Sequence, residues 1–233
     1  MLISGVQPFT NLDFPRKIAC IMFVPGCNFR CGYCHNPEFV VPERIQAMKG
    51  GFITEEAFFS FLDKRRGLLD GVVISGGEPT IMPELGRCAT RIKDRGFRVK
   101  LDTNGNRPDV LKKLLEQKLL DYVAMDYKTS LASYRTLVGT GASATRIRES
   151  REMLQTSGIE YEFRTTLIRE IHTPEILSAM IQELRGARRV CLQQFRPTVT
   201  LDPGYAALQP FSSEEVKALA EQFRQTVEEV IIR

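Results

Sequence analysis

Three cysteines lie close together near the start of the chain. Cys27, Cys31 and Cys34 follow a C-x3-C-x2-C spacing directly after a short apolar run. Cysteine thiolates are the usual ligands of iron-sulfur clusters, and three of them leave one iron of a [4Fe-4S] cluster open to another ligand. An open coordination position distinguishes a reactive metal site from a structural one. The spacing therefore predicts a [4Fe-4S] cluster with a reactive iron.

Three other uses of these thiols compete with the cluster. A structural zinc site needs a fourth ligand, and His35, directly after Cys34, is awkwardly placed to join the same tetrahedron. The C-x-x-C-H pattern ending at His35 also fits c-type haem attachment, but the first sixteen residues lack the basic cluster and apolar core of an export signal. A redox dithiol at Cys31 and Cys34 leaves Cys27 without a purpose. The cluster is the best interpretation of the loop.

Length, composition and charge favour one ordinary globular domain. The 233 residues are 43% hydrophobic and 26% charged, which is far from the composition of a disordered chain. The formal charge of +4 comes from 32 basic and 28 acidic residues spread along the chain, so nucleic-acid binding is not implied. We expect a single cytoplasmic domain over residues 1–233 with no membrane association. Three isolated cysteines do not form a disulfide framework and are expected to be buried: Cys20, Cys88 and Cys191.

Short apolar runs alternate with helix-patterned stretches along most of the chain. Six runs are predicted strands: 18–23, 72–75, 99–101, 122–125, 161–167 and 190–194. Three helix starts are marked by capping residues or proline: Thr54, Pro108 and Thr173. A capping box from Ser212 to Glu215 predicts a last helix over about 213–231, packed on a core of about 14–200. The alternation indicates an α/β fold with a mainly parallel sheet and outer helices, either doubly wound or a barrel.

Polar residues follow the predicted strands at the ends where parallel α/β folds gather their ligands. Gly76 and Gly77 end the second strand, where glycine permits close approach to a ligand or simply a tight turn. Asp102 follows the third strand, and Asp126 ends the fourth beside Lys128. These carboxylates belong either to one ligand site or to a capped turn at Asp102 and a structural ion pair between Asp126 and Lys128.

Arg164 and Phe195 are the polar and aromatic residues of the last two predicted strands. Arg164 interrupts a strand that otherwise reads as at least half buried, and a buried guanidinium usually has an anionic partner. Arg164 is therefore expected either to form a structural salt bridge or to contact a ligand or an incoming polypeptide. Phe195, at the end of the sixth strand, either stacks on a ligand or belongs to the core.

Taken together, the cysteine spacing, Tyr33 and the Gly-Gly-Glu-Pro sequence at 76–79 resemble the radical S-adenosylmethionine enzymes. Cys34-His35-Asn36 and the acidic strand ends narrow the likeness to the activases of glycyl radical enzymes, such as anaerobic ribonucleoside-triphosphate reductase and pyruvate formate-lyase, over about residues 14–197. No ferredoxin-like insert follows the cysteines, so a single cluster is implied. The resemblance also implies a partial (β/α)6 TIM-type barrel.

The resemblance implies a role for each matching residue. Cys27, Cys31 and Cys34 hold the cluster, whose open iron binds the amino and carboxylate groups of S-adenosylmethionine. Tyr33 lies by the adenine, and Lys128 faces the ligand carboxylate. Further residues hold or orient S-adenosylmethionine: Asn36, Gly76, Gly77, Glu78, Asp102, Thr103 and Arg164. A monovalent cation, Na⁺ or K⁺, is implied at four positions: Asp102, Thr103, Met125 and Asp126.

The implied reaction needs a one-electron donor of the flavodoxin or ferredoxin type and a glycyl radical enzyme as partner. S-adenosylmethionine is cleaved, and a 5′-deoxyadenosyl radical takes hydrogen from a backbone glycine of that partner. Two alternatives stay open: a radical enzyme acting on a small molecule, like 7-carboxy-7-deazaguanine synthase, and a non-catalytic iron-sulfur electron-transfer or scaffold protein. Activases with a histidine near Phe195 and Arg196 differ from this chain there, which leaves the adenine contacts open. The loop Val138-Gly139-Thr140-Gly141 lacks the ending of a phosphate-binding P-loop.

Overall fold

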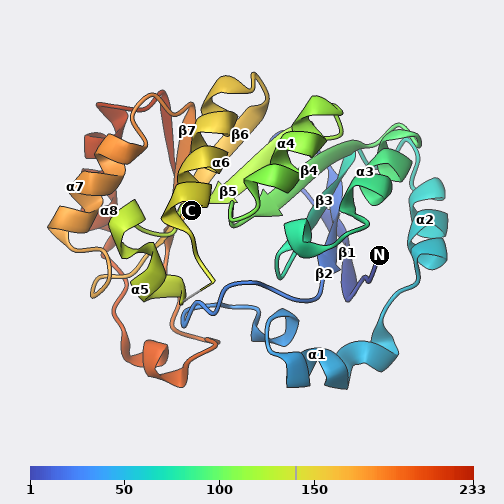
Figure 1. Cartoon of the computed structure of the whole chain (residues 1–233), viewed down its shortest axis with the longest axis horizontal. Coiled ribbons are helices and arrows are strands. Elements are labelled where there is room, and N and C mark those ends of the chain that lie inside the picture. The colour runs from blue at the N-terminus through green and yellow to red at the C-terminus, as the bar shows by residue number, and fades with distance from the viewer. Residues whose placement is uncertain (140) are drawn as a thin grey trace. The chain divides into compact units, whose positions relative to one another are not determined.

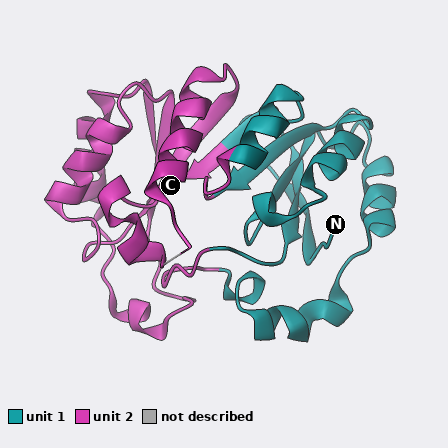
Figure 2. Ribbon diagram, in the orientation of Figure 1, with its two compact units in different colours: residues 1–28, 36–103, 109–123 teal, residues 29–35, 104–108, 124–233 magenta. Residues whose placement is uncertain are grey.

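The computed structural model of the chain describes residues 1–139 and 141–233, so that Thr140 of the glycine-containing loop lies outside the described residues. The chain forms two compact units, shown in separate colours in Figure 2. Unit 1 contains residues 1–28, 36–103 and 109–123, and unit 2 contains residues 29–35, 104–108 and 124–233. The chain passes several times from one unit to the other, and the single domain over residues 1–233 stays a prediction.

Unit 1 holds the first four strands. They are β1 (Gly5–Thr10), β2 (Ala19–Val24), β3 (Gly71–Gly76) and β4 (Arg98–Thr103). β1 pairs with β2 antiparallel, whereas β2, β3 and β4 pair in parallel. Its helices are α1 (Pro42–Met48), α2 (Glu55–Asp63), α3 (Leu85–Lys93) and most of α4 (Pro108–Glu116), with 3-10 turns η1 (Pro37–Phe39), η2 (Lys49–Gly51) and η3 (Pro79–Ile81).

Unit 2 holds the last three strands, and β5 (Tyr122–Asp126) begins in unit 1 and ends in unit 2. The strands are β6 (Glu160–Leu167), β7 (Arg189–Gln194) and β8 (Glu229–Ile232), all paired in parallel. The helices are α5 (Tyr134–Val138), α6 (Ala144–Thr156), α7 (Pro174–Glu183) and α8 (Ser213–Arg224), with 3-10 turns η4 (Leu131–Ser133) and η5 (Pro203–Ala207).

The strands follow chain order from β1 to β8 in a mostly parallel sheet, and Figure 1 shows helices flanking the strands of each unit. Each of the six predicted strands is present within two residues of its expected ends. Val72, Val73 and Ile74 of β3 are fully buried, as expected for an inner parallel strand that is covered on both faces. The α/β class with parallel strands and outer helices is confirmed.

Capping residues start the helices as the sequence indicates. Thr54 Oγ1 accepts a hydrogen bond of 3.1 Å from the Ala57 N–H at the start of α2. Thr173 caps α7 in the same way, ahead of Pro174. Ser212 and Glu215 form the predicted capping box of α8. Each cap satisfies backbone N–H groups that have no partner inside the helix.

The predicted last helix over about 213–231 is wrong in its second half. Helix α8 ends at Arg224, and Glu229–Ile232 forms strand β8 beside β7. Val227 and Val230 continue the apolar spacing of the helix, which is why the pattern predicts a longer one. They are buried after the chain has left the helix, and the β-branched residues at the end favour a strand.

The first strand, β1, is not among the six predicted strands. Gly5–Thr10 is a half-exposed strand that contains Pro8, which lowers its strand signal. No helix within the described part of the chain is long and apolar enough to cross a membrane.

Candidate functional site

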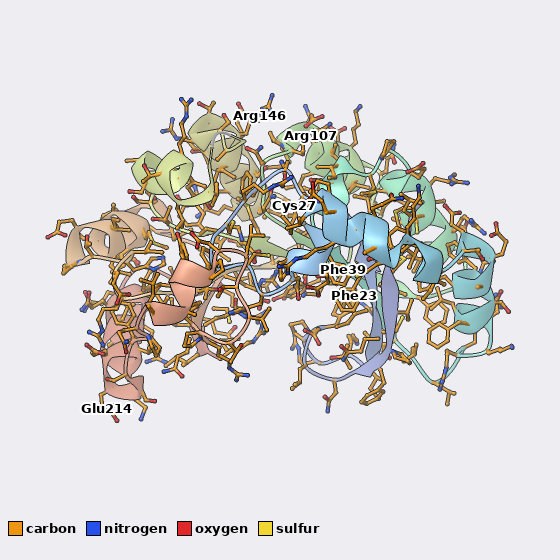
Figure 3. All side chains as sticks on the ribbon, turned by 90° about the horizontal axis from the view of Figure 1, so that it is seen from below. Phe23, Cys27, Phe39, Arg107, Arg146 and Glu214 are labelled. Carbon is orange, nitrogen blue, oxygen red and sulfur yellow. The ribbon has the colours of Figure 1, made fainter. Side chains whose placement is uncertain are left out.

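Cys27 lies in unit 1 on the loop that follows β2 (Figure 3). Its neighbour Gly26 has a φ of +91°, a conformation that glycine adopts without strain. The Gly26 N–H donates a 2.7 Å hydrogen bond to the Phe39 carbonyl. The rings of Phe23 and Phe39 stack with centroids 5.4 Å apart. The hydrogen bond from Gly26 and the stacking of Phe23 on Phe39 thus both fix the backbone that precedes Cys27.

The predicted glycine turn packs directly against this backbone. The Gly77 N–H donates to the Val24 carbonyl at 2.9 Å, and the Glu78 N–H donates to the Gly26 carbonyl at 2.7 Å. A Cβ added at Gly77 would overlap the Gly26 carbonyl, and Gly76 has a φ of +116°. Side chains are therefore excluded at both glycines by the protein's own backbone, as a tight turn requires, and close approach of a ligand stays a prediction.

Glu78 and Thr103 bond to each other at the ends of β3 and β4. The Glu78 carboxylate is 1% exposed, and its Oε1 accepts from the Thr103 hydroxyl at 2.7 Å. The same oxygen accepts from the Thr80 N–H at 3.0 Å, which caps η3. Glu78 thereby connects the glycine turn to the end of β4 and fixes the position of both.

Asp102 has a cationic partner on its own strand. Lys100 Nζ lies 2.6 Å from Asp102 Oδ1, and the Ser75 hydroxyl donates to Oδ2 at 3.0 Å. Lys100 is not predicted from the sequence as a site residue. The available signal is its spacing of two from Asp102, which places both side chains on one face of a strand.

The other two cysteines lie in unit 2, in a tight turn. The Cys34 N–H donates to the Cys31 carbonyl at 3.0 Å, and the preceding Arg30 N–H donates to the Val138 carbonyl at 3.2 Å. Cys31 is 7% exposed, and burial raises the pKa of its thiol despite the nearby Lys128 ammonium. Burial thus favours the neutral thiol of Cys31 over its thiolate.

A segment after β7 packs against this turn at Gly32, the glycine that follows Cys31. The Asp202 N–H donates to the Gly32 carbonyl at 2.9 Å. The Tyr205 ring lies against Gly32, with its centroid 6.3 Å from the centroid of the Tyr33 ring. No pattern around Tyr205 predicts this contact, because it depends on the path of the loop after β7.

Replacing Gly32 with alanine is expected to lower the free energy of unfolding by about 1–3 kcal/mol, because the added Cβ would overlap the Tyr205 ring. Denaturant unfolding under anaerobic conditions measures the change. With Tyr205→Ala present the obstacle is gone, so the double variant should lose less stability than the sum of the two single variants. At Gly51 an added Cβ meets nothing within 4 Å, and Gly51→Ala is the matched control. Strictly additive losses would contradict the contact.

Lys128, Asp126 and Arg164 form a charged group in unit 2. Lys128 Nζ lies 3.1 Å from Asp126 Oδ2, and Arg164 contacts Oδ1 through Nη2 at 2.8 Å and Nε at 2.9 Å. The predicted Asp126–Lys128 ion pair and the anionic partner of Arg164 are both present. Burial is the largest single influence and opposes the Lys128 charge, but Asp126, Tyr33 and Cys31 together outweigh it, so that the pKa of Lys128 lies well above its usual value. Two cations and one carboxylate leave a net formal charge of +1.

Two further residues fix the backbone of Lys128. The Lys128 N–H donates to the Tyr134 hydroxyl at 2.8 Å. His172 Nε2 donates to the Lys128 carbonyl at 3.0 Å, while its Nδ1 accepts from the Ile168 N–H at 3.0 Å. Nδ1 also lies 3.1 Å from the Ile168 carbonyl oxygen, and burial lowers the pKa of His172, which favours the neutral imidazole. Lys128 Nζ itself lies 5.8 Å from the centre of the Tyr33 ring.

His35 and Phe195 stack on each other in unit 2. Their ring centroids are 5.9 Å apart with an angle of 11° between the planes, and Phe195 is 2% exposed. His35 Nε2 also donates to the Arg196 carbonyl at 2.9 Å. His35 therefore orients the end of the cysteine loop, and one face of Phe195 is covered by His35.

The predicted site residues fall into two sets, one in each unit. Unit 1 contains Cys27, Asn36, Gly76, Gly77, Glu78, Asp102 and Thr103. Unit 2 contains Cys31, Tyr33, Cys34, Met125, Asp126, Lys128 and Arg164. Within unit 1, hydrogen bonds bring Glu78 and Thr103 together, and within unit 2 the ion pairs bring Asp126, Lys128 and Arg164 together.

Asn36 is exposed and makes no side-chain cap to η1. The residues that sequence reasoning missed are Lys100, Tyr134, His172 and Tyr205.

Comparison with protein families identifies the class that this arrangement defines. The model of the radical SAM superfamily matches residues 21–180, which include all three clustered cysteines, both strand-end carboxylates and Arg164. The chain belongs to the radical SAM superfamily. Membership implies a [4Fe-4S] cluster and S-adenosylmethionine, which the donor set fits: three thiols in one short loop and a cationic group around Lys128.

Curated relatives include activating enzymes. A protein of Methanocaldococcus jannaschii, provisionally named a glycyl-radical enzyme activating enzyme, is 30% identical over 100% of this chain and 95% of its own length. The pyruvate formate-lyase-activating enzyme of Streptococcus mutans is 33% identical over 54% of this chain and 50% of its own length. The chain thus spans nearly all of the first relative and half of the second.

Solved structures show the same fold at low sequence identity. SuiB of Streptococcus suis matches with a TM-score of 0.63 and 14% identity over 91% of this chain and 50% of SuiB. The enzyme anSMEcpe, solved with bound AdoMet, matches with a TM-score of 0.53 over 72% of this chain and 48% of its own length, at 14% identity. These neighbours agree with the predicted partial TIM-type barrel.

Proposed function

We propose that the chain is an activase that places a radical on a backbone glycine of a partner glycyl radical enzyme. The observation that carries this proposal is the similarity to the Methanocaldococcus jannaschii protein, which runs through the entire chain and almost all of that relative. The Cys34-His35-Asn36 sequence supports it, and so does the similarity to a pyruvate formate-lyase-activating enzyme.

In this proposal Cys27, Cys31 and Cys34 bind the cluster. When bound, the cluster supplies the electron for reductive cleavage of S-adenosylmethionine, which leads to hydrogen abstraction from the partner's glycine. The electron comes from a donor of the flavodoxin or ferredoxin type. The protein's own work is to bind and orient the reactants and to exclude water.

The residues of unit 2 suit the carboxylate end of S-adenosylmethionine. The group of Lys128, Arg164 and Asp126 carries a net positive charge, which attracts a carboxylate, and charge-assisted hydrogen bonds are the strong ones. Tyr134 and His172 hold the Lys128 backbone, so the ammonium is positioned before the ligand arrives. Tyr33, beside Lys128, offers its ring to the adenine.

The residues of unit 1 suit the amino end of S-adenosylmethionine. Gly76 and Gly77 present backbone without side chains next to the loop that leads to Cys27. Glu78 and Thr103 fix the ends of β3 and β4 against each other. We assign Asp102 and Asn36 to the same cosubstrate, in agreement with the resemblance of their motifs to activases.

An anaerobic reaction with candidate partners tests the proposal. The cluster-loaded protein is reduced with dithionite and mixed with S-adenosylmethionine and a glycyl radical enzyme. We expect 5′-deoxyadenosine together with a glycyl radical doublet in electron paramagnetic resonance. A partner whose radical glycine is replaced by alanine is the control and should give no doublet.

The failures of this experiment are informative in different ways. Formation of 5′-deoxyadenosine without a doublet from any partner contradicts the activase and favours a radical enzyme acting on a small molecule. The absence of 5′-deoxyadenosine in every mixture contradicts an enzyme altogether and favours an iron-sulfur electron-transfer or scaffold protein.

A further inference from the structure

Lys100 is buried in the middle of strand β4. It is 1% exposed and lies between Val99 and Leu101, which are fully buried. Side chains alternate along a strand, so Lys100 and Asp102 share one face, with 2.6 Å between Nζ and Oδ1. Nζ also lies 5.8 Å from the centre of the Tyr122 ring. A buried ammonium is costly unless it is compensated, and here a carboxylate and an aromatic face compensate it.

The Asp102 carboxylate is engaged at both oxygens. Oδ1 accepts from the Lys100 ammonium, and Oδ2 accepts from the Ser75 hydroxyl at 3.0 Å. Hard cations bind through several oxygen ligands and are attracted by the negative charge of a carboxylate. At Asp102 that charge is already balanced by an ammonium at hydrogen-bond distance.

The second carboxylate of the implied cation site is engaged as well. In unit 2, Arg164 contacts Asp126 Oδ1 at 2.8 Å and Lys128 contacts Oδ2 at 3.1 Å. The Thr103 hydroxyl donates to Glu78 in unit 1. Both implied carboxylates are therefore already paired with cationic side chains, and at Asp102 that partner is the single ammonium of Lys100.

The side chain of the fourth implied ligand is also committed to packing. Met125 is fully buried, and its side chain lies against Gly105, where a Cβ would overlap the methionine methyl group. Gly105 has a φ of +75°, so its backbone conformation favours glycine as well. This contact belongs to unit 2 and packs β5 against the loop after β4.

We propose that the Lys100 ammonium replaces a monovalent cation at Asp102, so that this chain binds S-adenosylmethionine without Na⁺ or K⁺. A lysine ammonium carries the same single positive charge as these ions and is tethered by its side chain to β4. Lys100 contacts Asp102 and acts through it, which makes Lys100 a positioning residue. The inference rests on the proposed function only where it assigns Asp102 to the S-adenosylmethionine site.

Sodium binding tests the proposal on the wild-type protein. The cluster-loaded protein is titrated with NaCl against tetramethylammonium chloride at constant ionic strength, and binding is read from the ²³Na nuclear magnetic resonance line width. We expect no saturable broadening. Saturable broadening that disappears in the Asp102→Asn variant overturns the proposal. The readout is ion binding and not turnover, so a failure here is distinguishable from a failure of the proposed function.

The Lys100→Met variant tests whether the Lys100 ammonium excludes a monovalent cation from Asp102. It keeps an apolar stem in the buried position but removes the charge, which leaves Asp102 without its ammonium. We expect this variant to gain saturable Na⁺ binding. Its unfolding temperature should rise by roughly 5–10 °C when Na⁺ or K⁺ at a hundredfold excess over its dissociation constant replaces tetramethylammonium. The same exchange should leave the wild type unchanged.

Lys93→Met is the matched control in the same unit. Lys93 Nζ lies 2.9 and 2.8 Å from the two carboxylate oxygens of Asp121, so this variant also removes an ammonium from a carboxylate. We expect it to lose stability without recovery in Na⁺ or K⁺. Equal recovery of the Lys100→Met and Lys93→Met variants overturns the proposal. If Lys100→Met does not fold, the wild-type titration decides alone.

Discussion

Replacing Cys27, Cys31 or Cys34 with alanine is expected to abolish iron binding and the cleavage of S-adenosylmethionine. Each variant removes one of three thiolates in the cluster loop, and no spare thiol follows within that loop. Iron per chain, the visible absorption of the cluster and 5′-deoxyadenosine formation should all fall to background. A single variant that keeps the iron content and activity of the wild type would remove that cysteine from the proposed ligand set.

Cysteines outside the loop provide matched controls. Cys20 in β2 and Cys88 in α3 are buried, and burial raises the pKa of each thiol to about 12. Both thiols lie outside the cysteine loop and act as small apolar side chains. Cys20→Ala and Cys88→Ala should therefore keep the cluster and the activity, with a loss of stability of about 1 kcal/mol. Loss of iron in either control would indicate that alanine replacement at any cysteine disrupts the fold.

Strands and ligand-loop positions follow from sequence because both depend on local pattern. Inner parallel strands such as β3 are continuous apolar runs, so Val72, Val73 and Ile74 indicate a strand without knowledge of its neighbours. Asp126 ends β5 and Lys128 follows it by two residues, and this closeness along the chain is why the Asp126–Lys128 pair is predictable. The sequence also predicts that Arg164 has an anionic partner. Identifying that partner as Asp126 requires the three-dimensional structure.

The residues that sequence reasoning missed depend on contacts between distant segments. Tyr205 reaches Gly32 across more than half of the chain, and His172 reaches the Lys128 carbonyl from the loop after β6. Neither contact leaves a periodic pattern. Strand β8 was missed for a different reason, since Val227 and Val230 keep the apolar spacing of the helix that precedes them. Local pattern therefore predicts the cysteine loop, whereas the contacts that support this loop require the three-dimensional structure.

Lys100 shows why the implied cation site stays a prediction. The resemblance concerns the carboxylates and not the residue two positions before Asp102. A lysine on the same strand face lies 2.6 Å from Asp102 Oδ1. The type of a ligand residue alone is therefore insufficient to predict a cation when a neighbouring side chain can supply the same charge.

Replacing Gly77 with alanine is expected to disrupt the structure around Cys27 and to cost more stability than Gly32→Ala. The added Cβ would overlap the Gly26 carbonyl and would lie 2.9 Å from the Phe39 carbonyl. Both overlapping groups are backbone carbonyls, which cannot relieve the overlap by a change of rotamer as a side chain can. We expect a stability loss of about 3 kcal/mol or more, at the upper end of the cost of overpacking. The hydrogen bond from Glu78 N–H to Gly26 should break as well.

Gly86→Ala separates this local effect from a general sensitivity to added methyl groups. Gly86 lies in the first turn of α3, where a Cβ would make ordinary contact with Leu114 at 3.9 Å. Because alanine is the better helix former, this control should gain up to about 1 kcal/mol of stability. Denaturant unfolding and iron per chain measure both variants. Since Gly77 lies at the turn that supports the loop before Cys27, Gly77→Ala should lose bound iron and 5′-deoxyadenosine formation together, whereas Gly86→Ala should lose neither. Wild-type stability and iron content in Gly77→Ala would show that this backbone can move without cost and that the glycine turn does not hold the cluster loop.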